Sequence, residues 1–188
     1  MDGAVRFALG GMLSAREKGL KPVGADTHYR SRINLGEVKR YIEAQSPETR
    51  IYIGADSQRL VIGSVWYADY TLAIVVHING KNGCKLFGEV VRERDYDQKK
   101  DKPQFRLMNE VYKVADLYLK LADVLDDRHV EVHLDINPDE MHGSHCVMQQ
   151  AIGYIRGTCN VIPMVKPQAF AASYAADRLK EIKSGSLG

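Results

Sequence analysis

The pattern of apolar and polar positions becomes regular at residue 34. Apolar residues then recur at helical intervals up to residue 46, directly after Asn34, a residue type that caps helix starts. Beyond residue 50 the period changes to that of β-strands. Three strand-like segments follow, and the sequence NGKNG between the last two is a turn signal: residues 50–58, 64–78 and 84–94. This part of the chain predicts a short helix followed by an antiparallel three-stranded meander.

The second half of the chain alternates helices and strands. Apolar residues at helical spacing from Leu107 onward predict a long helix over residues 103–125, and strict alternation predicts a fourth strand over 129–137. The remaining predicted elements are a helix at 139–156, a fifth strand at 159–167 and an alanine-rich helix at 168–182. Parallel strands joined by helices cross over with a right hand. We therefore predict an α/β protein with a mixed five-strand sheet, order 3-2-1-4-5 along the chain, flanked by helices.

The composition excludes some classes of protein but does not point to one function. The chain has 188 residues, 45% of them hydrophobic and 27% charged, which fits a folded, water-soluble protein. We expect residues 1–47 to form an irregular arm and the short helix, and residues 48–188 to form one domain. A net charge of +2 excludes a strongly basic nucleic-acid coat protein but allows a local basic groove. Three cysteines without paired spacing, and no signal-like or membrane-spanning segment, predict a cytoplasmic protein.

Two predicted strands end in a carboxylate. In the first strand Asp56 follows Tyr52 and Gly54 on one face, and in the fourth strand Asp135 follows His133. If these strands are parallel neighbours, the two acids meet at their carboxyl ends, where open α/β sheets place ligands. Close carboxylates repel and need protons or a cation between them, and hard oxygen ligands favour Mg²⁺ or Mn²⁺. The alternative is that each aspartate only caps a loop.

The long predicted helix supplies a third candidate by elimination. At 3.6 residues per turn, Asp116 and Asp123 fall opposite the apolar stripe. Glu110 lies on the flank of that stripe near the helix start, so it is the acid that can reach the carboxyl edge of the sheet. Its alternative role is that of a solvated boundary acid.

Four segments of the chain together match a known pattern: IYIGADSQ, EVHLDIN, GYIRG and VKPQAFAASYAADRLK. Through these segments, residues 48–183 resemble the ribonuclease-H-like fold and, more narrowly, the YkuK-like family of bacterial and phage proteins. In ribonuclease-H-like nucleases, acids that bind metal come from the first strand, the first helix after the meander, the fourth strand and the final helix. The resemblance therefore implies that Asp56, Glu110, Asp135 and Asp177 bind the catalytic Mg²⁺ or Mn²⁺. Helical periodicity alone places Asp177 toward solvent.

Five further residues are candidates for contact with substrate. Ser57 and Gln58 directly follow Asp56, and Lys166 ends the fifth predicted strand, where it can meet a phosphate. His142 and His145 are expected in a loop that lines the site and handles a proton or a phosphate. A zinc site with Cys146 is disfavoured by the spacing, and ordinary surface histidines are the other alternative.

Three functions fit these features to different degrees. The first is a divalent-metal-dependent nuclease acting on RNA, DNA or a hybrid of the two. The second is a non-catalytic nucleic-acid-binding or assembly module with the same fold. The third, an actin-like or Hsp70-like ATPase, needs a glycine-rich phosphate loop after the first aspartate, and GADSQRLVIGS lacks that density of glycines. The charged loop over residues 92–106 is expected to be a solvated loop that can touch a phosphate backbone.

Overall fold

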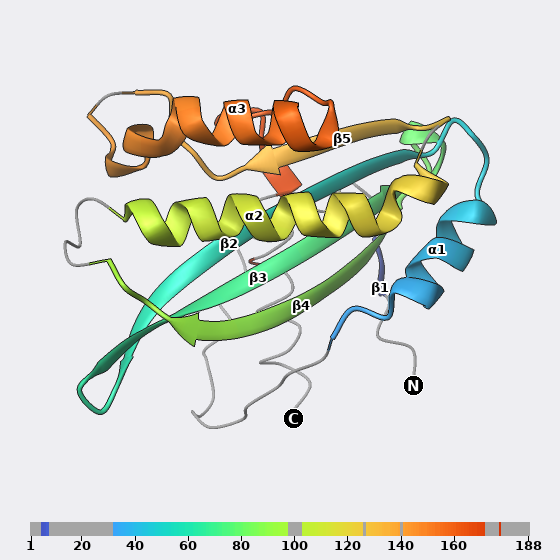
Figure 1. Ribbon diagram of the computed structural model, residues 1–188. Helices are drawn as coiled ribbons and strands as arrows, with labels where there is room; N and C mark the ends of the chain where they lie inside the picture. Colours follow the sequence, from blue (N-terminus) through green and yellow to red (C-terminus); the bar gives the residue numbers. More distant parts are fainter. Residues whose placement is uncertain are drawn as a thin grey trace, which may run out of the picture.

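A computed structural model of the chain describes residues 5–7, 32–97, 103–125, 127–139, 141–171 and 177. Its centre is one mixed sheet with the strand order β1-β4-β3-β2-β5 (Figure 1). Strands β2 and β3 are antiparallel, as are β3 and β4, whereas β2 and β5 are parallel. The strands are β1 (Val5–Phe7), β2 (Arg50–Ile62), β3 (Val65–His77), β4 (Cys84–Arg94) and β5 (His129–Leu134).

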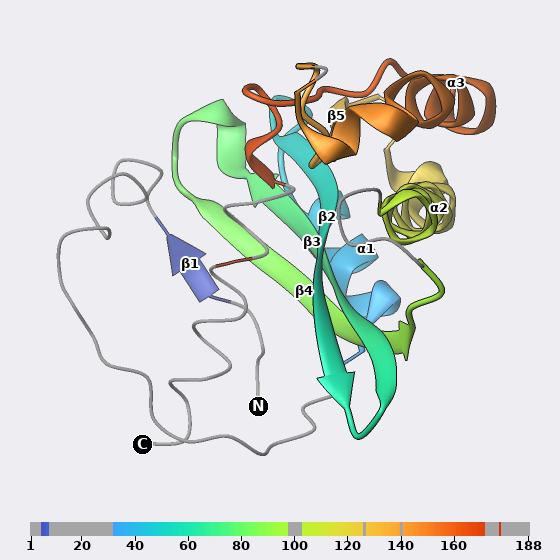
Figure 2. The same ribbon diagram turned by 90° about the vertical axis from the view of Figure 1, so that its left-hand side faces the viewer.

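Three helices cover one face of this sheet, as Figure 2 shows. They are α1 (Leu35–Glu43), α2 (Gln104–Leu121) and α3 (Met148–Cys159). Alternate residues of β2, among them Ile51, Ile53 and Ala55, pack against these helices in the main core. A smaller apolar cluster lies on the opposite face around Tyr52, where Phe170 and Ala171 cover the sheet. Both faces of β2 are therefore buried along its first half, which explains its apolar sequence.

The first four predicted strands and their order are confirmed: the meander β4-β3-β2 is followed by β5, parallel to β2. The first helix is confirmed as well, and the side chain of Asn34 accepts a hydrogen bond from Glu37 N at 3.2 Å as its cap. The helix predicted over 139–156 divides into a 3₁₀ segment, η5 (Gly143–Val147), and α3.

The fifth predicted strand is not formed. Residues 159–167 do lie beside β5, but they make a single parallel bridge there, between Met164 and His133. One reason is that α3 continues to Cys159 and uses the start of the segment. Another is that Pro163 and Pro167 have no N–H to donate to a ladder. The backbone bonds that remain, such as Met164 N to Val132 O at 2.8 Å, hold the segment at the sheet edge.

Two further features of the sheet were not predicted. Residues 5–7 of the N-terminal arm form β1, which adds an antiparallel edge strand beside β4. Strand β2 continues four residues beyond the predicted end at Gln58, and the β2–β3 hairpin extends past the rest of the sheet (Figure 1). Most of the predicted closing helix, residues 168–182, lies outside the described residues. Among the helices that the structure describes, none has the length and apolar character needed to cross a membrane.

Candidate active site

Asp56 and Asp135 lie at the same end of neighbouring strands. The last pair in the parallel register of β2 and β5 is Ala55 with Leu134, and each aspartate directly follows one member of that pair. Both are partly buried, and the side chain of Asp135 is 19% exposed. The parallel pairing of β2 with β5 thus brings together two acids that are 79 residues apart in the sequence.

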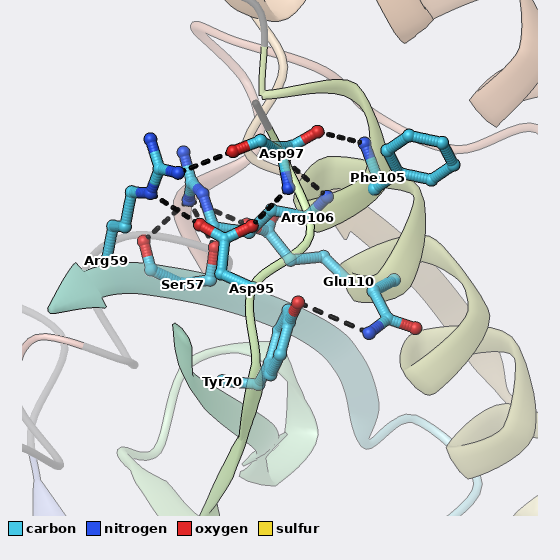
Figure 3. Close-up of polar contacts among 9 residues, drawn as sticks. Ser57, Arg59, Tyr70, Asp95, Asp97, Phe105, Arg106 and Glu110 are labelled. Atoms are coloured by element: carbon cyan, nitrogen blue, oxygen red, sulfur yellow. Dashed lines mark hydrogen bonds and ion pairs between the residues drawn. The ribbon is translucent and has the colours of Figure 1, made fainter. Parts of the chain in front are cut away.

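Glu110 approaches the same end of β2 from helix α2. It is buried, and Ser57 Oγ donates a hydrogen bond to its Oε1 (Figure 3). Burial, as the largest cause, and the charges of Asp56 and Asp135 together raise the pKa of Glu110 to about 8, against the opposite effects of Ser57 and Arg106. The three acids therefore lie within electrostatic reach of one another, and Glu110 holds its proton at neutral pH without an added cation.

Strand alternation explains why Ser57 is the β2 residue that contacts Glu110. Ser57 shares its face with Ile53 and Ala55, and this is the face that α2 covers. Arg106, one helical turn before Glu110, donates from Nη1 to Ser57 O at 3.0 Å and to Ser57 Oγ, and the same Nη1 lies 3.6 Å from Glu110 Oε1. The guanidinium thus joins the helix to the strand beside the buried acid.

Asp135 is paired with a cation from the far side of β5. Lys166 Nζ lies 2.6 Å from Asp135 Oδ1, and the backbone N–H of Lys166 donates to Ile136 O at 3.0 Å. The segment predicted as a fifth strand does not form a strand, but it places Lys166 at the end of the sheet that carries Asp56 and Asp135. We call this end the acid end of the sheet. The lysine side chain remains 41% exposed, so its ammonium also faces solvent.

A second cluster, which we call the aspartate clasp, fixes the start of α2 (Figure 3). Both oxygens of Asp97 accept backbone N–H bonds of the first helical turn, from Phe105 at 2.8 Å and Arg106 at 2.9 Å. Asp95 accepts from Asp97 N at 2.9 Å, and its Oδ2 lies 2.6 Å from Arg59 Nε. This clasp caps a helix whose own N-cap residue, Pro103, has no capping side chain.

The clasp corrects the sequence interpretation of residues 92–106 as a solvated loop. Asp95 and Asp97 are only 7% and 6% exposed. The signal in the sequence was a pair of aspartates shortly before a helix that begins without a cap of its own. Residues 98–102, with three of the lysines of that segment, lie outside the described residues.

Residues 34–181 match the family model described as Ribonuclease H-like. The chain belongs to the ribonuclease H-like family. No curated protein and no solved structure matches it. The match includes α1 and ends beyond Asp177, and it leaves the narrower resemblance to the YkuK-like family as a prediction.

Four other residues were predicted for this ribonuclease H-like site. Gln58 is exposed on β2, opposite Asp69 of β3. His142 is exposed before η5, and His145 lies within η5, which packs against α2. Asp177 is helical and exposed, and the residues on both sides of it lie outside the described part of the chain. The roles of these four residues stay predictions.

The acid end of the sheet fits a hard divalent cation by its chemistry. Asp56, Glu110 and Asp135 offer only carboxylate oxygens, and a cation would offset the charges of Asp56 and Asp135, which add to the effect of burial in raising the pKa of Glu110. Within the described ranges, however, no three His, Cys, Asp or Glu side chains form a group that could hold a metal ion as they stand. Ser57, Arg106 and Lys166 make contacts with two of these acids instead.

Proposed function

We propose that this ribonuclease H-like protein is a divalent-metal-dependent nuclease that hydrolyses phosphodiester bonds of nucleic acids. One observation carries the proposal: Asp56 and Asp135 directly follow the last parallel pair of β2 and β5, and the buried Glu110 reaches the same end of β2 through its contact with Ser57. Three acids from a central strand, the first long helix and the neighbouring parallel strand are costly to bring together unless a cation or a proton is used there. Membership of the ribonuclease H-like family supports the same chemistry.

In this proposal Asp56, Glu110 and Asp135 hold Mg²⁺ or Mn²⁺, and Asp177 from the closing helix completes the set. When bound, the metal activates water and stabilises the charge that develops on the phosphate oxygens. The carboxylates favour Mg²⁺ or Mn²⁺ over softer metals by their ligand type, since all of them are hard oxygen donors. Family membership and the acid set leave the choice among RNA, DNA and hybrid substrates open.

The basic and hydroxyl groups of the site have separate roles in the proposal. Lys166, already at Asp135, binds a phosphate oxygen of the substrate, because its ammonium is partly exposed. Ser57 and Arg106 position the Glu110 carboxyl group and stabilise the negative charge of the carboxylate when the proton leaves. Gln58, His142 and His145 contact the substrate from the strand and from the loop after β5.

The test combines cleavage with metal binding. Asp56→Asn and Asp135→Asn should abolish Mn²⁺-dependent cleavage of a panel of hybrid, duplex and single-stranded substrates, while the metal-free fold stays as stable or becomes slightly more so. Asp116→Asn is the matched control, because Asp116 is exposed on α2 and pairs with Lys120 at 2.6 Å. Millimolar Mn²⁺ should raise the melting temperature of the parent but not of Asp56→Asn. Unfolding of Asp56→Asn, or cleavage equal to that of the parent, would refute the proposal.

A non-catalytic nucleic-acid-binding or assembly module is the second candidate. The observation that favours it is that cations of the chain already lie beside two of the acids, Lys166 at Asp135 and Arg106 near Glu110. In that case the protein binds nucleic acid equally well with Mn²⁺ and with EDTA, cleaves no member of the panel, and keeps the same melting temperature in both solutions.

A further inference from the structure

Three large aromatic side chains stand exposed beside the aspartate clasp. Trp66 is 45% exposed, Tyr96 69% and Phe105 70%. They come from three segments, namely the start of β3, the residues after β4 and the first turn of α2. We call Trp66, Tyr96 and Phe105 the aromatic platform. Large exposed apolar surface on a folded domain marks a candidate interaction site.

The clasp holds in place the backbone of the residues that carry these rings. Trp66 O accepts a hydrogen bond from Asp95 N at 2.9 Å, and Phe105 N donates to Asp97 Oδ1 at 2.8 Å. Tyr96 lies between these two buried aspartates in the sequence. The platform is therefore built on fixed backbone, which lowers the entropy lost when a ligand stacks on it.

Two of the rings are backed by arginines. The guanidinium carbon of Arg59 lies 4.2 Å from the centre of the Trp66 ring, and that of Arg94 lies 5.5 Å from the Tyr96 ring. Since a guanidinium covers one face of a ring, the exposed area leaves the other face for a ligand. By contrast Tyr112 and Tyr154, which are also exposed, pack against each other with centres 4.8 Å apart.

Residues next to the aromatic platform contact the acid end of the sheet. Phe105 directly precedes Arg106, whose guanidinium contacts Ser57 and Glu110 (Figure 3). Arg59 belongs to β2, three residues beyond Asp56, and is tied to Asp95 and to Asp97 O. A chain of nucleotides that follows the rings therefore leads toward the proposed cleavage site, with positive charge along its path.

We propose that the aromatic platform binds single-stranded nucleic acid, with unpaired bases stacked on Trp66, Tyr96 and Phe105. Bases inside a duplex are already stacked on one another and cannot lie on these rings, so the platform selects single strands or single-stranded ends. The inference rests on the proposed function where it assigns the substrate of the nuclease. Binding itself needs no cleavage.

Trp66 is the only tryptophan of the chain, so its fluorescence reports directly on the platform. The parent protein in EDTA is titrated with a 12-nucleotide oligo(dT) or oligo(U), and with a blunt duplex of equal length. We expect the single strands to quench Trp66 emission and the duplex to leave it unchanged. Tyr96→Ala and Phe105→Ala should weaken single-strand binding, measured by anisotropy of a labelled oligonucleotide, by about 5- to 100-fold each. Tyr112→Ala, an exposed aromatic of α2 outside the platform, should bind like the parent.

The outcomes separate the platform from the nuclease. Quenching by single strands in both the parent and Asp56→Asn supports the platform even if no cleavage is found. Cleavage with unchanged affinity in Tyr96→Ala and Phe105→Ala overturns the platform and leaves the nuclease standing. Unchanged Trp66 emission at saturating oligonucleotide also overturns it. So does self-association that Trp66→Ala abolishes, since the patch would then be a contact between copies of the chain.

Discussion

Two buried polar clusters lie on opposite faces of the sheet, around Glu110 on the helix-covered face and around His133 on the other. Both side chains are almost fully buried, at 4% and 0% exposure. Burial acts on both in the direction expected for its charge type: it raises the pKa of Glu110 to about 8 and lowers the pKa of His133. The two clusters differ in how the remaining polar atoms are satisfied.

His133 is satisfied within the fold. Its Nδ1 accepts a hydrogen bond from Ala171 N at 3.0 Å, so the ring proton is on Nε2, which lies 3.0 Å from Glu131 Oε2. The ring also contacts Tyr52 and Phe170, with centres 5.4 and 4.8 Å away. Although burial alone would raise the pKa of Glu131, hydrogen bonds from His133 and His129 lower it. This neutral histidine and its carboxylate fasten residue 171 to β5.

The groups around Glu110 act on it in opposite directions. It has one hydroxyl donor and one guanidinium nearby, but two further acids act on it from the ends of β2 and β5. The buried histidine has partners on both ring nitrogens, whereas the buried glutamate also has the charges of two further acids acting on it. We propose that this difference reflects a structural role for the His133 cluster and a ligand-binding role for the Glu110 cluster.

The largest expected effect that tests this comparison is the loss of the His133 side chain. His133→Ala should lower the free energy of unfolding by about 3 kcal/mol, because it opens a cavity and leaves Ala171 N and Glu131 without their partner. Urea denaturation measures the change. His129→Ala, at the exposed end of the same chain of contacts, should change stability by less than about 1 kcal/mol. A stable His133→Ala protein that has lost nucleic-acid cleavage would instead assign a functional role to this face.

The sequence was sufficient for features that depend on local periodicity. The bounds predicted for the third strand, residues 84–94, are those of β4, and α2 lies within the predicted 103–125. Alternation together with a right-handed crossover also brought Asp56 and Asp135 to one end of neighbouring strands. These predictions succeed because each depends on a period of two or 3.6 residues and on one chain-wide rule.

Features that depend on particular side-chain pairs were not visible in the sequence. The contact of Ser57 with Glu110 joins residues 53 apart, and the pairing of Arg59 with Asp95 joins a strand to a loop. Apolar character at 159–167 predicted a strand, but the prolines left a single bridge there. His133 has both ring nitrogens engaged within the fold, one by Ala171 N, which is 38 residues away in the sequence.

The second prediction concerns the pH dependence that the Glu110 cluster confers. Between pH 5 and 7 Glu110 is protonated in the folded metal-free protein and ionised in the unfolded chain, so the folded state binds more protons and its stability falls as pH rises. Glu110→Gln removes this dependence of stability on pH. The parent should therefore lose about 2 kcal/mol relative to Glu110→Gln from pH 5 to pH 7. Denaturation in EDTA at several pH values measures this difference.

The control for that profile is Asp116→Asn, an exposed acid of the same helix, which should follow the parent at every pH. His133 acts with the opposite sign: its lowered pKa makes the folded protein lose stability as pH falls below about 6.5, through the unfolded value. Parallel profiles for Glu110→Gln and the parent would show that Glu110 is already ionised in the fold, and the contrast drawn between Glu110 and His133 would then fail.

The smallest expected effect is at the aspartate clasp, which holds the Glu110 helix in place. Asp97→Asn keeps one acceptor oxygen but removes the negative charge and one of the two bonds to Phe105 N and Arg106 N at the helix start. Such a loss at a cap should lower the free energy of unfolding by about 1 kcal/mol. Asp139→Asn is the control, because Asp139 accepts from Met141 N in an exposed loop and should change stability by less than about 0.5 kcal/mol. Hydrogen exchange sharpens the result, since faster exchange confined to the first turn of α2 locates the effect at the clasp. A loss as large as that of His133→Ala would mean that the clasp supports the whole sheet, and the structural role assigned to the His133 face would then belong to both faces.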